Sequence, residues 1–215
     1  MPLQNRVDPF GEIKAVPQRG MLMGNRGGAI HDPETKTLLK RKWASKAWII
    51  CVCEFKGKKR ELMGRNPQTG SAGWTELFFL DEVTALAAGH RPCFYCRRER
   101  ATDFLGRHRA ATGTQHSAPE LDDILHSQRL ATGAKPVEVD RLGLSMLPDG
   151  AMFSEGGADF AIRNGRALRW SFSGYGAPMA FDEFDADEMC IVTPAASIAV
   201  LAAGYAPVWH PSAGP

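Results

Sequence analysis

The sequence predicts an α+β fold, and three observations support this class. Trp74–Leu80 is an apolar run with the length of a central strand. Asp81 and Gly89 frame a helix directly after it, as an N-cap and a C-terminal stop. Asn164-Gly165 lies between two short strand-like segments, which is a strong type I′ hairpin signal. The chain has 215 residues, of which 44% are hydrophobic, so it is long enough to bury a core without cross-links.

The chain is expected to form two modules joined by a polar segment at 112–118. We place a basic module at 1–115 and an acidic α+β module at 116–215, packed on the first. Ser117 and Glu120 form a capping-box pattern, and Thr193 is expected to cap the last helix with Pro194 at its first position. The expected elements are a short strand near 21–23, a buried strand at 47–55, a basic hairpin tip at 56–60 with a return strand at 61–63, a central strand at 74–80, helices at 81–89, 97–111 and 117–130, a β-meander of short strands between 136 and 192, and a terminal helix at 193–204.

Charge is distributed unevenly between these modules. Residues 1–110 carry 20 Lys and Arg against 11 Asp and Glu, a net +9, whereas residues 111–215 carry 6 against 13, a net −7; the two sum to the +2 of the whole chain. A basic half suggests an anionic partner, or electrostatic docking on the acidic half. Solvated surface charge without a partner is the alternative.

Five cysteines, two of them spaced as Cys93-x-x-Cys96, indicate a metal site. The pair follows a helix stop at Gly89 and a corner at Pro92, so the turn points both sulfurs into one volume. Thiolates bind zinc well, and Zn²⁺ is therefore the expected cofactor. The N-terminus has no apolar signal-peptide core, and no apolar run is long enough for a membrane span, so we expect a cytoplasmic protein with reduced thiols and no membrane partner. The alternative is a pair of ordinary thiols near a turn.

Basic side chains with aromatic rings between them favour nucleic acid as the partner. Cations neutralise phosphate, and rings such as Trp43 and Trp48 offer stacking surfaces. The alternative is that the tryptophans belong to the core and that the lysines are solubilising. The candidate nucleic-acid-binding residues are Lys40, Arg41, Lys42, Trp43, Lys46, Lys58, Lys59, Arg60, Arg97 and Arg98.

A second hypothesis is an enzyme, hydrolase- or nuclease-like, with a polar site between the two halves. Glu76 stands in an apolar strand, where a carboxylate is either paired with an arginine or is a general base. Asp122 and His126 are four residues apart on an expected helix, and such a pair is the minimum for an oriented base, although most such pairs are surface contacts. These three, with Gln4, Asn5 and Arg6, are the candidate catalytic groups, and a common pocket would distinguish them from scattered polar residues. A binding module without chemistry is the third hypothesis.

The segment ALAAGHRPCFYCRR, around Cys93 and Cys96, resembles the second half of the metal-binding domain of the Ada alkylation-response protein and related modules of bacterial nucleases. The segment from Met23 to His31 is similar to the start of such modules, so the resemblance covers about residues 20–100. It implies zinc, DNA rather than RNA as partner, a role in DNA repair or processing, and His31, Cys93 and Cys96 as ligands. The second ligand of the family is a cysteine, but Thr35 stands at that position here.

Either Cys51 or Cys53 must then complete a four-ligand set. Chemistry alone does not choose between them, and we prefer Cys51, with Cys53 as a small buried residue. In Ada the first ligand is a thiolate that accepts a methyl group. His31 cannot repeat that reaction, so we predict a structural Cys₃His zinc site rather than methyl transfer.

Two further patterns leave alternatives open. Pro92-Cys93-x-x-Cys96 also fits zinc deaminases, but the glutamate that they need two residues after the first ligand is absent, which makes this the weaker hypothesis. In addition, Leu86–Pro92 recurs in part as Leu201–Pro207, from either a duplicated unit or a helix end that arose twice.

Overall fold

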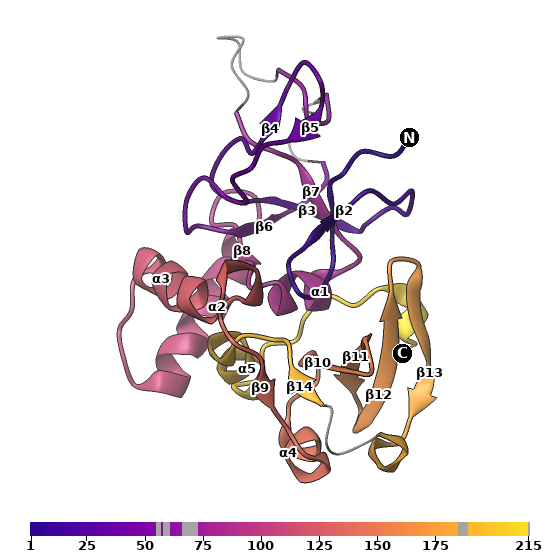
Figure 1. The fold of residues 1–215 in the computed structure, drawn as a ribbon. Coiled ribbons are helices and arrows are strands. Elements are labelled where there is room, and N and C mark those ends of the chain that lie inside the picture. Colours follow the sequence, from indigo (N-terminus) through magenta and orange to yellow (C-terminus); the bar gives the residue numbers. More distant parts are fainter. Residues whose placement is uncertain (55–56, 58–60, 66–72, 185–188, 215) are drawn as a thin grey trace.

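The computed structural model describes residues 1–215 apart from 55–56, 58–60, 66–72, 185–188 and 215. Its helices and sheets confirm the α+β class. Figure 1 shows a first sheet near one end of the molecule and a second sheet near the other, with α1 (Glu82–Ala87) and α5 (Ala195–Ala202) between them. Helices α2 (Arg98–Thr112) and α3 (Ala118–Gln128) cover one side.

The first sheet has the strand order β2-β1-β7-β3-β6-β8 in the described residues. It is mixed, since β1 runs parallel to β7 and β6 runs parallel to β8. The central position of β7 agrees with the apolar run that predicted it. The strands are β1 (Arg6–Val7), β2 (Ile13–Lys14), β3 (Leu22–Asn25), β6 (Ile49–Cys51), β7 (Leu77–Phe79) and β8 (Arg91–Pro92), with β4 (His31–Asp32) and β5 (Thr37–Leu38) paired in a separate two-stranded sheet.

The hairpin expected after β6 is not formed as predicted. The return strand expected at 61–63 is a turn, in which Met63 has a φ of 52° and is fully buried. A positive φ is incompatible with an extended strand, so Met63 cannot belong to a return strand. The basic tip expected at 56–60 lies, apart from Gly57, outside the described residues.

Helix α1 is anchored to both sheets. Asp81 caps it as predicted, by accepting the Thr84 amide at 2.9 Å. The second carboxylate oxygen of Asp81 accepts the hydroxyl of Tyr175 at 2.9 Å and the amide of His210 at 3.0 Å, both from the C-terminal half. Val83 on α1 packs into a core cluster with the second sheet, whereas Leu86 packs into a cluster with the first. The helix that precedes Cys93 is therefore held on both sides.

The second sheet is an antiparallel meander with the order β13-β12-β11-β10-β14-β9. Asn164 and Gly165 have φ values of 51° and 67°, which confirms the predicted type I′ turn between β11 and β12. At the start of the β-meander expected between 136 and 192, only Val137–Glu138 is a strand, because Asp140 caps a helix there by accepting the Gly143 amide at 2.7 Å. The elements are β9 (Val137–Glu138), α4 (Arg141–Met146), β10 (Met152–Glu155), β11 (Ala158–Arg163), β12 (Arg166–Ser171), β13 (Gly174–Met179) and β14 (Cys190–Ile191), with 3₁₀ turns at Leu130–Thr132, Phe181–Glu183 and Pro211–Ala213.

The helices of the second half pack on those of the first. The Ser117–Glu120 capping box opens α3 as predicted. Thr193 does not cap α5; its hydroxyl accepts the Met152 amide at 2.8 Å, and the residue at the N-cap is Pro194. One continuous apolar cluster contains residues of the first sheet and of α1, α2, α3 and α5, so the core is shared across residue 115. The division into two modules stays a prediction.

The two similar segments, Leu86–Pro92 and Leu201–Pro207, have a common local structure. Gly89 and Gly204 have φ values of 74° and 90°, and the residue after each donates to a carbonyl five positions back: His90 to Ala85 at 2.9 Å and Tyr205 to Val200 at 3.2 Å. This is the Schellman end of a helix, which requires a residue that tolerates positive φ. A duplicated unit and a helix end that arose twice would both have this shared structure, so the two alternatives stay open.

Candidate metal centre

Three cysteines from two parts of the chain meet in one cluster. The sulfur atoms of Cys51, Cys93 and Cys96 all lie within 4.8 Å of one another. A tetrahedral zinc with Zn–S bonds of about 2.3 Å places its sulfurs about 3.8 Å apart, so this cluster needs little adjustment to hold an ion. The three cysteines could therefore bind a metal, and they include the pair that the sequence indicated.

Strand pairing brings the third thiol to the C-x-x-C pair. β8 runs parallel to the end of β6, and the Cys93 amide continues the ladder by donating to the Ile50 carbonyl at 2.9 Å. Cys51, the last residue of β6, is therefore fixed beside the turn that carries Cys93 and Cys96. Cys51 and Cys93 are buried, and Cys96 is partly exposed.

Hydrogen bonds within the cluster favour one thiolate. The thiols of Cys51 and Cys96 lower the pKa of the Cys93 thiol, and the Tyr95 amide adds to this by donating to Cys93 Sγ at 3.3 Å. The pKa of the Cys51 thiol is raised, first by its hydrogen bonds to Cys93 and Cys96, then by burial and by the negative charge of the neighbouring sulfurs. Cys93 is thus the first of the three to ionise, and a bound cation would favour ionisation of all three.

His31 lies outside the cluster, contrary to the Cys₃His set implied by the Ada resemblance. Its imidazole is buried, and Nδ1 lies 2.6 Å from the hydroxyl of Thr75. The same hydroxyl accepts the Ile30 amide at 2.8 Å, so Thr75 contacts both the side chain of His31 and the backbone beside it. His31 belongs to the small β4–β5 sheet, whereas Cys51 belongs to the large one, and the pairing of separate sheets could not be read from local sequence.

Cys53 is also outside the cluster, although it lies near it. Its side chain is exposed rather than buried, and its thiol donates to the Met21 carbonyl at 3.3 Å. The backbone leaves the strand after Cys51, so the alternation that would place Cys51 and Cys53 on one side does not continue. The preference for Cys51 agrees with this arrangement.

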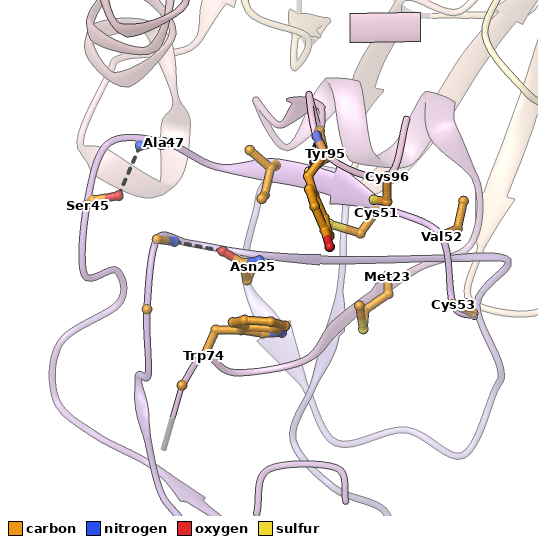
Figure 2. Close-up of a pocket in the computed structure, with 15 residues that line it drawn as sticks. Met23, Asn25, Ser45, Ala47, Cys51, Val52, Cys53, Trp74, Tyr95 and Cys96 are labelled. Carbon is orange, nitrogen blue, oxygen red and sulfur yellow. Dashed lines mark hydrogen bonds between the residues drawn. The ribbon is translucent and has the colours of Figure 1, made fainter. Parts of the chain in front are cut away.

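A cavity of about 500 Å³ opens directly beside the cluster (Figure 2). The three clustered cysteines and Cys53 line it together with aromatic, apolar and amide side chains. Trp74 and Tyr95 enter it from different segments, and Tyr95 is 69% exposed. Asn25 and Ser45 are polar residues of the lining; the Oδ1 atom of Asn25 accepts the Gly27 amide at 3.0 Å, which leaves its NH₂ group for another partner.

Part of the predicted nucleic-acid surface is interior. Trp48 is 0% exposed, and the guanidinium groups of Arg26 and Arg129 lie 3.8 and 4.4 Å from its ring centroid. Burial, with the charge of Arg129 next in importance, lowers the pKa of Arg26 to about 9. Trp43 is partly buried and packs edge-on to His126, with centroids 5.4 Å apart. These rings stabilise the junction between the two halves, which is the core interpretation of the two tryptophans.

Four of the predicted cations have structural partners of their own. Lys42 pairs with Glu12 at 2.8 Å, and Arg41 donates to the Ala29 carbonyl. Arg97 is buried, and its guanidinium lies 2.8 Å from the fully buried carboxylate of Glu82. Lys46 is exposed and pairs with Asp123 at 2.9 Å. Lys58, Lys59 and Arg60 lie outside the described residues. The cations of the predicted set that remain on the described surface are Lys40, Arg41, Lys42, Lys46 and Arg98.

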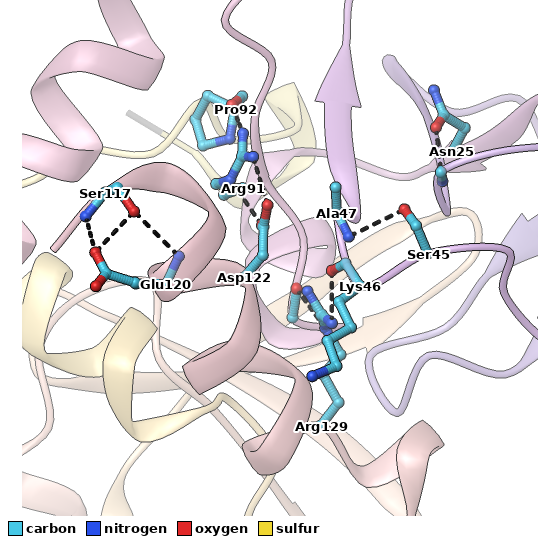
Figure 3. A network of polar contacts seen from close by, with 12 residues as sticks. Asn25, Ser45, Lys46, Ala47, Arg91, Pro92, Ser117, Glu120, Asp122 and Arg129 are labelled. Carbon is cyan, nitrogen blue, oxygen red and sulfur yellow. Dashed lines mark hydrogen bonds and ion pairs between the residues drawn. The ribbon is translucent and has the colours of Figure 1, made fainter.

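Asp122 and His126 do not form the predicted pair. Figure 3 shows Asp122 beside Arg91 instead. Both oxygens of Asp122 accept from Arg91, at 2.8 Å from Nε and 2.7 Å from Nη2, and the two side chains are buried. His126 instead lies 3.5 Å from Arg129 through Nδ1. Asp122 therefore fixes the strand that precedes Cys93, and it holds no imidazole in place for proton transfer.

The remaining catalytic candidates also have separate positions. Glu76 is fully buried, and its carboxylate accepts the Met63 amide at 2.9 Å. Gln4 donates to the backbone of β2 at 2.9 Å, and the side chains of Asn5 and Arg6 contact each other. Asn5 and Arg6 line one pocket together with Leu62, whereas Asp122 and His126 lie on α3, so the described contacts do not gather the candidates around a common point. In the described part of the chain, the lining of the cavity beside the cysteines includes none of them.

Sequence reasoning missed the aromatic pair of the cavity and the arginine that holds Asp122. Tyr95 had a local signal, because it lies between the two cysteines of the C-x-x-C. Trp74 was assigned to the strand, although β7 begins only at Leu77. Arg91 pairs with a residue 31 positions away, and no local pattern reports such a contact.

Comparison with known proteins assigns neither a family nor a function to this chain. No protein-family model matches the chain, and no curated protein or solved structure matches it. The resemblance to the Ada metal-binding domain therefore stays a prediction. Among the described residues, no helix combines the length and the apolar character needed to cross a membrane.

Proposed function

We propose that this chain is a zinc protein in which Cys51, Cys93 and Cys96 hold one Zn²⁺, and that it binds nucleic acid, DNA in preference to RNA. The observation that carries the proposal is the mutual approach of three thiols within 4.8 Å. Soft thiolate ligands select zinc over the hard cations Mg²⁺ and Ca²⁺, and the resemblance to the Ada domain supports the same metal and the same partner.

Zinc at this position would join two segments that the backbone alone connects weakly. β6 and β8 pair over only two residues, Ile49 with Arg91 and Ile50 with Pro92. A metal bound by Cys51 on one side and by the C-x-x-C turn on the other would close this junction at the start of α2. The ion would thus stabilise this junction, and its fourth coordination position would be left for a ligand other than the three thiolates.

The composition of the cavity favours binding over hydrolysis. A zinc hydrolase or deaminase needs a carboxylate or imidazole near the metal to move protons. The described lining instead consists of thiol, aromatic, apolar, small, amide and hydroxyl groups, the last from Ser45 and Tyr95. Such groups bind and orient a ligand, so the enzyme hypothesis has less support than the binding hypothesis.

Support for nucleic acid comes from the cations that stay on the surface. Lys40, Arg41 and Lys42 are consecutive and exposed, in the half of the chain with a net +9. Arg98 is exposed two residues after Cys96, and Lys46 lies between two residues that line the cavity. Phosphates of a bound strand could contact these cations while the strand lies beside the zinc centre.

The test is the salt dependence of binding to a fluorescently labelled DNA strand. Each single-strand phosphate contact contributes about 0.7 to the slope of log affinity against log salt, so replacing Lys40, Arg41 and Lys42 by alanine should reduce the slope by up to about 2. The matched control is Arg166→Ala with Arg169→Ala, two exposed arginines on β12, which should leave the slope unchanged. Absent binding at low salt, or affinity independent of salt, would refute the nucleic-acid part.

The preference for DNA has a simple test of its own. An RNA strand of the same sequence, used as competitor, should displace the labelled DNA less well than unlabelled DNA does. Equal or better competition by RNA would contradict that preference and leave the zinc site untouched.

A further inference from the structure

The cavity beside the cysteine cluster has the size and the walls of a small-molecule site. Its volume of about 500 Å³ falls within the range of about 300–1,000 Å³ that is typical of ligand pockets. Met23 and Ile49 contribute apolar walls from β3 and β6, the two strands beside the cluster. The walls are thus built on a paired sheet rather than on surface loops alone.

Two aromatic side chains from separate segments line this space. Figure 2 shows Tyr95 extending into the cavity from the turn between Cys93 and Cys96, and Trp74 on the other side of the β3 backbone. Both line the cavity together with the thiols. Aromatic faces bind flat, π-rich ligands, and base–aromatic stacking is tolerant of base identity.

One amide supplies a fixed polar contact for the edge of such a ligand. Asn25 is buried in β3, and its Oδ1 atom is held by the Gly27 amide at 3.0 Å. This bond sets the orientation of the Asn25 side chain and leaves its NH₂ group as a donor for a ligand in the cavity that Asn25 lines. A ligand that suits these walls has a planar apolar face and hydrogen-bond acceptors on its edge.

We propose that this cavity binds a single unpaired nucleobase, stacked on Trp74 or Tyr95 with its polar edge at Asn25. The proposal rests on the nucleic-acid function proposed above, and it names the part of the nucleic acid that enters the site. A nucleobase has a flat π face and edge acceptors, and a base taken out of a duplex is commonly held by stacking and edge hydrogen bonds. Exposed Lys46 and Arg98, adjacent in sequence to lining residues, suit the attached phosphate.

The experiment measures binding of the four deoxynucleoside monophosphates to the zinc-loaded full chain by isothermal titration calorimetry. Deoxyribose 5-phosphate is the matched ligand without a base. The variants are Trp74→Leu and Tyr95→Ala, and the control is Trp209→Leu, a partly exposed tryptophan in the C-terminal half. Zinc content and far-UV circular dichroism are measured on every sample.

We expect at least one nucleotide to bind and the baseless phosphate to bind much more weakly. Loss of one stacking ring should weaken nucleotide binding about 5- to 150-fold, whereas Trp209→Leu should bind as the wild type does. Because Tyr95 is 69% exposed, its truncation should leave the fold intact even if Trp74→Leu does not fold.

Three results would overturn the proposed nucleobase site. They are no nucleotide binding by zinc-loaded protein, equal binding of deoxyribose 5-phosphate and the nucleotides, or an unchanged nucleotide affinity in the folded Trp74→Leu and Tyr95→Ala variants. These differ from failure of the proposed function. A wild-type protein that binds no zinc, or that binds no DNA strand, contradicts the earlier proposal itself. Zinc-loaded protein that binds DNA but no nucleotide contradicts only the base site.

Discussion

Asp122→Ala should be among the most destabilising single changes in this chain. The carboxylate accepts two hydrogen bonds from Arg91, at 2.8 and 2.7 Å, and the two side chains are only 5% and 9% exposed. Removing one partner of a buried ion pair leaves the other charge unpaired and dehydrated, which costs about 3–5 kcal/mol. Loss of this ion pair should also make the turn that carries Cys93 and Cys96 less rigid, because Arg91 precedes Cys93 by two residues.

The neighbouring residue provides a matched control. Asp123 pairs with Lys46 at 2.9 Å, but the two side chains are 61% and 53% exposed. Solvent screens such a pair, so Asp123→Ala should change the free energy of unfolding by about 0–1 kcal/mol. The double variant Arg91→Met with Asp122→Leu should recover much of the loss, since apolar residues can replace a buried pair of similar volume.

The assay is equilibrium unfolding in urea, followed by tryptophan fluorescence at a fixed zinc concentration. The expected order of stability is wild type and Asp123→Ala first, then the double variant, then Asp122→Ala. If Asp122→Ala and Asp123→Ala have the same small effect, the buried pair does not hold β8 and the reasoning is wrong.

Three further predictions concern other parts of the fold. Burial, and then the nearby charge of Asp8, raises the pKa of Asp159 from its usual 3.8 to about 6, so its contribution to stability is present below about pH 4 and is lost as the pH rises through 6. Asp159→Asn should therefore raise the free energy of unfolding at pH 7.5 by about 1–2 kcal/mol, a figure reduced for solvent screening of a partly exposed group, and should raise it little at pH 4. Equal gains in urea unfolding at the two pH values would contradict this. Gly89→Ala should lower the melting temperature more than Gly113→Ala does. Both positions have positive φ, which costs about 1–2 kcal/mol for a residue with a Cβ. A Cβ at Gly89 would also lie 2.5 Å from Cγ of Arg129, whereas no atom lies within 4 Å of a Cβ at Gly113. Glu82→Gln should cost about 3–5 kcal/mol in urea unfolding, because its carboxylate lies 2.8 and 2.7 Å from two arginines in a fully buried position; a loss below about 1 kcal/mol would show that the pairs are not needed.

Local signals in the sequence predicted the local structure well. The Asp81 cap, the capping box at Ser117 and the Asn164-Gly165 turn all formed where the residue types required them. In each case the stabilising contact joins residues within four positions of one another, so the chain needs no distant partner to form it. The proximity of Cys93 and Cys96 was predictable for the same reason.

Contacts between distant segments were not predictable in this way. Cys51 reaches the C-x-x-C turn because β6 and β8 pair in parallel, whereas His31 is held in another sheet by Thr75. Both residues had suitable chemistry as ligands, and only the arrangement of strands separates them. The interpretation of Trp48 as an exposed stacking ring was wrong for the same reason. The two arginines that pack on its ring are Arg26 and Arg129, which are distant from it in the sequence.

The most direct test of the account is the zinc content of the wild type and four variants. The zinc in each purified protein is measured by elemental mass spectrometry and divided by the protein concentration. The wild type should carry one zinc per chain, Cys51→Ser, Cys93→Ser and Cys96→Ser should each lose it, and His31→Gln should retain it while folded. Zinc that survives the Cys51 change but disappears with His31, or a wild type without metal, would contradict the three-thiolate centre.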